Sequence, residues 1–310
     1  MNMLRSVFLA ASESGWLREQ AQHRGFARRA VSRFMPGETL DAALGAAASL
    51  AGERLGTILT HLGENVADAS EARAVTDHVL ELVRRVCDSG VDTEVSVKLT
   101  QLGLDLGPGL ATENMLRIIG AARGLSGRLW IDMESSPYVE RTLEIFKALQ
   151  PQHPRLGVAI QAYLHRSAAD VESLVALGAA VRLVKGAYQE SAAVAMQHKP
   201  DVDESFFRLS ARLLAPDARR NSAWLAAGTH DPVLIARLAA HAESQGVARD
   251  AYEFAMLYGI QRAEQSRLAA AGNRCRVLVS YGSFWFPWYM RRLAERPANV
   301  LFVLRGMLGK

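Results

Sequence analysis

From residue 56 onward, short runs of apolar and β-branched residues alternate with longer stretches in which apolar residues recur at helical spacing. Short apolar runs of this kind are typical of strands that are buried on both faces. The longer stretches carry helix signals, such as Asp231-Pro232 at a start and Gly90 or Gly178 at an end. The pattern predicts strands at residues 56–62, 93–99, 128–133, 155–161, 180–185, 223–229, 251–256 and 276–280, each followed by a helix.

Strands that alternate with helices pair in parallel, and eight such units over roughly 250 residues are the usual size of a (β/α)8 TIM barrel. We therefore predict an α/β barrel domain at residues 55–310, preceded by an N-terminal helical arm at residues 1–54. A doubly wound open sheet is the alternative. It would carry a glycine-rich phosphate loop after its first strand, and THLGEN at residues 60–65 is not such a loop.

Composition narrows the function classes. The 310 residues are 49% hydrophobic with a net charge of +4, and the basic residues are dispersed, which argues against nucleic-acid binding. The two cysteines, Cys87 and Cys275, and the histidines show no metal-ligand spacing, so we expect free thiols and no metal. No run approaches 18 apolar residues, and we expect a cytoplasmic protein. The basic amphipathic stretch at residues 16–34 either packs on the barrel or touches anionic lipid at the inner face of the membrane.

The C-terminal stretch carries a candidate carboxylate site. Arg291 and Arg292 are adjacent on a predicted helix, with Glu295 about one turn later on the face of Arg291. An arginine binds a carboxylate through two parallel hydrogen bonds. Trp288 and other aromatic residues lie just upstream, so the pattern suits a small ligand with one carboxylate and an apolar body. The alternative is a solvated helix with surface ion pairs.

Polar side chains stand at the predicted carboxyl ends of the strands, where TIM barrels place their active sites. These residues are Glu64, Lys98, Asp132, Gln161, Lys185, Thr229, His230, Glu253 and Tyr281. Lys185-Gly186-Ala187 combines a cation with open backbone amides, which suits a phosphate or a reduced flavin. Lys185 or Lys98 could instead form a Schiff base with a carbonyl substrate.

Seven motifs resemble the proline dehydrogenase family, in the bacterial monofunctional form. They are VSVKL at 95–99, WIDME at 130–134, IQAYL at 160–164, RLVKGAY at 182–188, GTHD at 228–231, EFAMLYGI at 253–260 and RRLAERPAN at 291–299. The resemblance implies a distorted (β/α)8 barrel with FAD at the strand ends. It also implies oxidation of L-proline to Δ1-pyrroline-5-carboxylate, with the electrons passing to a membrane quinone.

The resemblance also implies residue roles. Arg291 and Arg292 would bind the proline carboxylate, Glu295 would orient them, and Glu64 would pair with Arg291 as a gate. Lys98 and Asp132 would line the site, and Leu183 and Tyr188 would pack on the proline ring. FAD would be held by Asp132, Gln161, Arg182, Val184, Lys185, Gly186, Ala187, Thr229, His230, Leu257 and Glu295.

Three positions depart from the family pattern. Leu278 and Trp288 stand where the family usually has tyrosines in the proline pocket, and Ala255 stands where it has a glutamine near the flavin. Losing two hydroxyls should disfavour 4-hydroxyproline relative to proline or an alkyl-substituted analogue. The departures also leave two alternatives open, a dehydrogenase of another cyclic amino acid and a non-catalytic relative.

Overall fold

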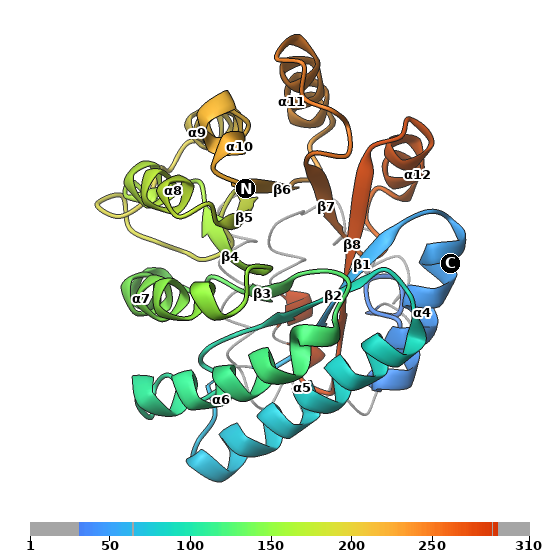
Figure 1. Cartoon of the computed structure of the whole chain (residues 1–310), viewed down its shortest axis with the longest axis vertical. Coiled ribbons are helices and arrows are strands. Elements are labelled where there is room, and N and C mark those ends of the chain that lie inside the picture. The colour runs from blue at the N-terminus through green and yellow to red at the C-terminus, as the bar shows by residue number, and fades with distance from the viewer. Residues whose placement is uncertain (1–30, 64, 287, 291–310) are drawn as a thin grey trace, which may run out of the picture.

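The strands close into a parallel barrel. The computed structural model describes residues 31–63, 65–286 and 288–290. Each strand pairs with the next and β8 pairs with β1, in the order β1 to β8 (Figure 1). The strands are β1 Gly56–His61, β2 Thr93–Val97, β3 Leu129–Ile131, β4 Leu156–Gln161, β5 Ala180–Val184, β6 Trp224–Gly228, β7 Glu253–Leu257 and β8 Arg274–Tyr281. The predicted TIM barrel is confirmed, and the pairing of β1 with β8 excludes the open sheet.

Helices cover the outside of the barrel. They are α4 Leu40–Gly52, α5 Ala69–Ser89, α6 Pro108–Ala121, α7 Val139–Leu149, α8 Ser167–Ala176, α9 Lys199–Leu213, α10 Pro216–Arg220, α11 Pro232–Ser244 and α12 Arg262–Ala270, with 3₁₀ turns η1 Ala122–Gly124, η2 Ser136–Tyr138 and η3 Gln150–Gln152. Their ends follow the sequence signals: the Asp231 side chain accepts from Val233 N, and Gly90 ends α5 at a φ of 64°. The helix expected from Tyr258 begins at Arg262 instead, because Gly259 and Gln261 adopt positive φ in the preceding turn.

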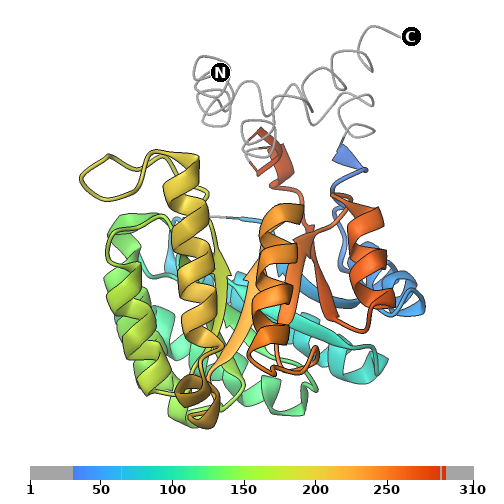
Figure 2. The ribbon, with the colours of Figure 1, turned by 90° about the horizontal axis from the view of Figure 1, so that it is seen from above.

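One helix of the predicted N-terminal arm, α4, packs in the layer of helices around the barrel. The buried face of α4, Leu40, Ala43, Ala47 and Leu50, joins the main core beside β1 and β8 (Figure 1). It occupies the outer position that a helix after β8 takes in a regular barrel. The chain after β8 instead lies at one end of the barrel (Figure 2), where Trp285 and Phe286 pack with Val31, Phe34, Met35, Leu62 and Tyr289. Residues 1–30 lie outside the described residues.

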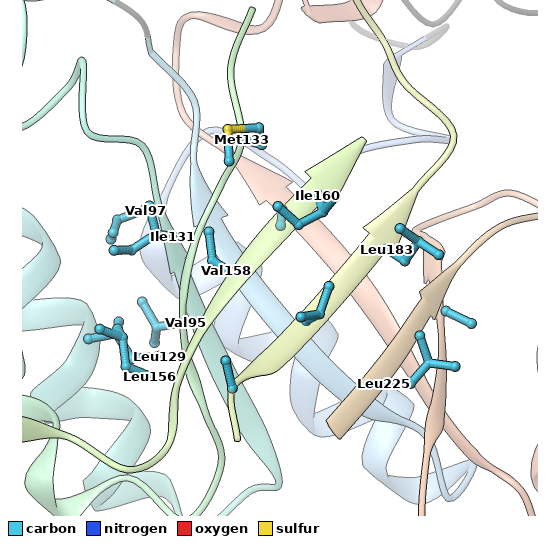
Figure 3. Packing of buried hydrophobic residues seen from close by; sticks show 14 of the residues in the cluster. Val95, Val97, Leu129, Ile131, Met133, Leu156, Val158, Ile160, Leu183 and Leu225 are labelled. Carbon is cyan, nitrogen blue, oxygen red and sulfur yellow. The ribbon is translucent and has the colours of Figure 1, made fainter. Parts of the chain in front are cut away.

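The main core lies between the strands and the helices. Alternate strand residues point outward into it, including Val95, Val97, Leu129, Ile131, Val158, Ile160, Leu183 and Leu225 (Figure 3). A second, smaller cluster fills the barrel interior with Ile58, Trp130, Ala180, Ala226 and Ala255. Because both faces of each strand are buried, the strands read as continuous apolar runs in the sequence.

The amino end of the barrel interior is closed by buried charges. Arg276 Nε donates to Glu253 Oε2 at 2.9 Å and lies 3.3 Å from Glu94 Oε1, and Trp130 Nε1 donates to Glu94 at 2.5 Å. Burial and the neighbouring Glu94 carboxylate raise the pKa of Glu253 to about 7. Glu253 was expected at the carboxyl end, and this expectation is wrong because Glu253 is the first residue of β7.

Candidate active site

A cavity of about 690 Å³ opens at the carboxyl ends of the strands. It is bordered by residues from β1 to β8, from the loops that follow them and from the segment after β8. The predicted site residues that line it are Lys98, Asp132, Gln161, Arg182, Val184, Lys185, Gly186, Ala187, Tyr188, Thr229, His230, Leu257, Leu278 and Trp288. Ala255, the third departure from the family pattern, also lines it. Residues far apart in the sequence therefore share one concave site.

Leu183 does not share that site. Its neighbours on β5, Arg182 and Val184, line the cavity, so the alternation of a strand turns Leu183 to the opposite face. There it is fully buried in the core between barrel and helices (Figure 3). The expected contact of Leu183 with the proline ring does not fit this placement. Glu64, Arg291, Arg292 and Glu295 lie outside the described residues, and their roles stay predictions.

A buried ion pair crosses the barrel beneath the cavity. Arg182 of β5 binds Asp132, which follows β3, through Nη2 and Oδ1. Ser96 of β2 donates to Asp132 Oδ1 at 2.8 Å and accepts from Arg182 Nη2 at 3.0 Å. The Arg182 guanidinium also stacks over Trp130, 5.2 Å from the ring centroid. Its Nη1 is buried without a partner in the described part of the chain, which leaves a charged donor for a ligand in the cavity.

Two lysines and two aspartates form a second charged group at the ends of β5 and β6. Lys185 Nζ donates to Asp203 at 2.5 Å and to Asp231 at 3.1 Å, and Lys199 binds the same two carboxylates. Burial acts to raise the pKa of Asp231, but the hydrogen bonds from Lys199 and Lys185 outweigh it and lower that pKa to about 2. Sequence reasoning missed Lys199 and Asp203. Their i, i+4 spacing at the start of α9 was the available signal.

The turn after β5 presents backbone amides to the cavity. Ala187 N donates to Gln161 Oε1 at 3.3 Å, and Gln161 Nε2 donates to the Glu134 carbonyl at 2.9 Å. Gly186 has a φ of 132°, and a Cβ there would meet the Tyr163 ring. Only glycine fits this close approach, so the turn is held in place by β4 and the residues after it.

The ends of β6 and β7 are joined by a histidine. His230 Nε2 accepts a hydrogen bond from Leu257 N at 2.8 Å, which requires a lone pair on that nitrogen. Thr229 Oγ1 accepts from Asp231 N at 3.2 Å. Both side chains thus fix the backbone that borders the cavity as well as lining it.

The wall formed by β8, β1, β2 and the residues after them combines apolar and polar side chains. Leu278, Leu62 and Trp288 line it, together with Thr60, Ser280 and Lys98, whose Nζ lies 3.5 Å from the Gly63 carbonyl. Ser280 Oγ is buried and has no hydrogen-bond partner in the described part of the chain. Sequence reasoning missed Ser280, although its spacing of two from Leu278 placed both on the same face of β8.

The described residues contain no helix that is long and apolar enough to cross a bilayer. Within the same residues, no group of three or more histidine, cysteine, aspartate or glutamate side chains is arranged to hold a metal ion.

Known proteins resemble this chain along its whole length. The family model for proline dehydrogenase matches residues 43–305. Proline dehydrogenase 1 of Bacillus subtilis subsp. natto is 38% identical over 309 residues, covering 99% of this chain and 100% of that protein. Proline dehydrogenase of Deinococcus radiodurans is 34% identical over 311 residues, covering 99% and 98%.

A solved structure supports the fold alone. The proline utilization A protein of Bdellovibrio bacteriovorus, inactivated by N-propargylglycine, superposes with a TM-score of 0.81 at 24% identity. The match covers 95% of this chain and 36% of that protein, so this chain spans about a third of its length.

Proposed function

The chain belongs to the proline dehydrogenase family, and we propose that it oxidises L-proline to Δ1-pyrroline-5-carboxylate with FAD bound at the carboxyl ends of its barrel strands. The observation that best supports this proposal is one cavity at those ends. It is lined by motif residues at or after strands throughout the barrel. Proline oxidation is the activity of the family. FAD and the individual residue roles are the proposal.

The residues around the cavity fit a flavin. Arg182 offers a buried guanidinium nitrogen that has no partner in the described residues, suited to an electron-rich ring atom. Lys185, Lys199 and the backbone of Gly186 suit the negative phosphates. Gln161, Val184, Thr229, His230 and Leu257 border the same space. When bound, FAD supplies the two-electron acceptor, and the protein supplies binding and orientation.

We assign substrate binding to the opposite wall and to the C-terminal segment that carries Arg291 and Arg292. We assign Arg291 and Arg292 to the proline carboxylate, oriented by Glu295, with Glu64 as the gate partner of Arg291. Leu278, Trp288 and Tyr188 border the space for the ring, and apolar contacts there exclude water from the reacting carbon. The ring nitrogen must lose its extra proton before the C–H bond breaks, since its lone pair forms the imine. Lys98 and the Asp132–Arg182 pair are the charged groups that line this part of the cavity, and we assign them to the electrostatic field at the proline ring nitrogen.

The electrons are proposed to pass to a membrane quinone. This assignment rests on the family, and peripheral contact with the membrane would bring the cavity to that acceptor. Reoxidation of the proline-reduced protein by a soluble quinone tests it.

A Schiff-base reaction at Lys185 fits the structure poorly. Asp203 and Asp231 lie 2.5 Å and 3.1 Å from its Nζ, so two carboxylates already contact the nitrogen that would have to attack a carbonyl substrate. Lys98 remains the other lysine on the cavity wall. Borohydride treatment with a carbonyl substrate should trap no adduct at either lysine.

FAD binding can be measured directly. Lys185→Met should weaken FAD binding about ten- to a hundredfold, because one charged hydrogen bond to a phosphate is worth about 1.5–3 kcal/mol. Titration of apoprotein with FAD, followed by flavin fluorescence, gives the Kd. Lys147→Met, on the surface of α7, is the matched control and should leave the Kd unchanged. A wild-type protein that takes up no FAD would contradict the cofactor assignment.

A further inference from the structure

Three aromatic side chains form a cluster directly behind the substrate wall of the cavity. His61 ends β1, Tyr281 ends β8, and His78 lies in α5. The Tyr281 hydroxyl is 2.8 Å from His78 Nε2, the two imidazole rings are 4.4 Å apart, and the His61 and Tyr281 rings are 5.4 Å apart. Their strand neighbours Thr60 and Ser280 line the cavity, so the cluster occupies the outer face of the same two strands.

The cluster is neutral at neutral pH, with Tyr281 buried and both histidines partly buried. Tyr281 is fully buried, and His61 Nδ1 is buried without a hydrogen-bond partner in the described residues. Burial, with a smaller contribution from His78, lowers the pKa of His61 to about 4. Burial also lowers the pKa of His78, against the attraction of Glu81, which itself is bound by Arg84. Burial raises the pKa of Tyr281.

The residues that follow His61 and Tyr281 in the chain lead to segments that border the substrate space. Leu62, next to His61, lines the cavity and donates its N–H to the Tyr281 carbonyl at 2.7 Å. Gln101 Nε2 donates to the His61 carbonyl at 3.2 Å. Gly282 has a φ of 125°, and a Cβ there would lie 3.1 Å from the His61 ring, so the strand exit packs directly on the cluster. The segment that begins at Gly282 carries Trp288 into the cavity wall.

We propose that His61, His78 and Tyr281 are positioning residues that hold Leu62 and Trp288 against the bound substrate. This inference rests on the proposed function of the cavity. The neutral rings tie the ends of β1 and β8 to α5, and this fixes the two segments relative to each other. Protonating both imidazoles would place two positive charges on rings in contact and drive them apart. The groups facing them are Tyr281 from β8 and Glu81 from α5.

The flavin side of the cavity takes its hydrogen-bond partners from elements other than β1, β8 and α5, which carry the cluster. Arg182, Lys185 and Gln161 come from β4 and β5, and their partners come from β2, β3, α9 and the end of β6. Disturbing the cluster should therefore change substrate binding more than FAD content. That separation distinguishes a positioning role from a general loss of folding.

Tyr281→Phe tests the proposal, because it removes one hydroxyl and keeps the ring. We expect the KM for proline to rise about three- to tenfold, the effect of one neutral hydrogen bond, with kcat within about twofold and FAD content unchanged. His78→Gln keeps a hydrogen-bonding group that does not titrate, so it should retain the wild-type KM at neutral pH. Its kcat/KM relative to wild type should rise at least about threefold as the pH falls from about 7 towards about 4, because the lowered pKa values of His61 and His78 delay their protonation to this acidic range. His241→Gln, in α11 where the partly buried His241 ring packs on Phe207, is the control and should follow the wild-type pH profile.

An unchanged KM in Tyr281→Phe would overturn the proposal, as would a rise in KM that appears only together with lost FAD and a lower Tm. A His78→Gln profile that runs parallel to wild type would also overturn it. Failure of the proposed function is a separate result, since the wild-type protein itself would then show no flavin or no turnover of proline.

Discussion

Replacing Arg292 with methionine is expected to lower kcat/KM for proline by about ten- to a hundredfold or more while most of the FAD stays bound. The variant loses one of two guanidinium groups assigned to the proline carboxylate. A charged hydrogen bond is worth about 1.5–3 kcal/mol, and its loss appears directly in kcat/KM. Steady-state kinetics with an artificial acceptor, together with flavin absorbance per protein, measure both quantities.

A surface arginine provides the matched control for this variant. Arg117 of α6 pairs with Asp77 and is 40% exposed, and exposed pairs contribute little. Arg117→Met should keep wild-type kcat/KM. Unchanged activity in Arg292→Met would remove Arg292 from the carboxylate site.

Replacing Arg182 with methionine is expected to disrupt both stability and flavin binding. The Arg182 side chain is 4% exposed and the Asp132 side chain 18%, so the variant leaves a carboxylate partly buried without its cation. Removing one partner of a buried ion pair costs about 3–5 kcal/mol of unfolding free energy. We expect a loss near the lower end of that range, together with low FAD occupancy and at least about a tenfold loss of kcat/KM.

A double variant separates the two effects. Arg182→Met with Asp132→Asn removes the stranded charge, so part of the lost stability should return while FAD occupancy and activity stay low. Chemical denaturation of the apoproteins measures the stability, and FAD titration measures the binding. Arg212→Met, which breaks the partly exposed ion pairs of Arg212 with Glu172 and Asp217, is the control. Wild-type FAD content in Arg182→Met would contradict the assignment of Arg182 to the flavin.

The barrel could be predicted from the sequence because the strands are buried on both faces. Such strands read as continuous apolar runs, and eight of them alternating with capped helices leave few topologies. The residues that follow each run could be placed at one end for the same reason, since parallel strands bring all their carboxyl ends together. Lys98, Asp132, Gln161 and Lys185 came to one cavity in this way.

Finer features of the site could be placed only from the three-dimensional course of the backbone. Glu253 was placed among the residues at the carboxyl ends, but it is the first residue of β7, so its carboxylate lies at the opposite end of the barrel. Leu183 sits in a motif whose neighbours line the cavity, and only the alternation of β5 shows that its side chain faces away. The partners of Lys185 come from α9 and from the start of α11, and no local pattern links them to β5. α4 packs on the outside of β1 and β8 because the residues that follow β8 lie at one end of the barrel and not in that outer position. This is a long-range packing effect.

The substrate preference is predicted from the cavity wall that Leu278 and Trp288 line. Leu278 and Trp288 offer apolar contacts where the family has hydroxyls, so proline or an alkyl-substituted analogue should reduce the flavin faster than 4-hydroxyproline. Pipecolate and methylprolines complete the panel, because an indole changes the shape of the pocket. Leu278→Tyr restores one hydroxyl and should narrow the gap between proline and 4-hydroxyproline. Fastest reduction by 4-hydroxyproline in the wild-type protein would contradict this prediction.

Adding proline to the FAD-loaded protein without oxygen tests whether proline transfers electrons to a flavin held in this cavity. We expect the flavin absorbance to bleach and Δ1-pyrroline-5-carboxylate to form in equal amount. Arg292→Met should bleach only at higher proline concentration or more slowly. A flavin that stays oxidised at saturating proline in the wild-type protein would contradict the account.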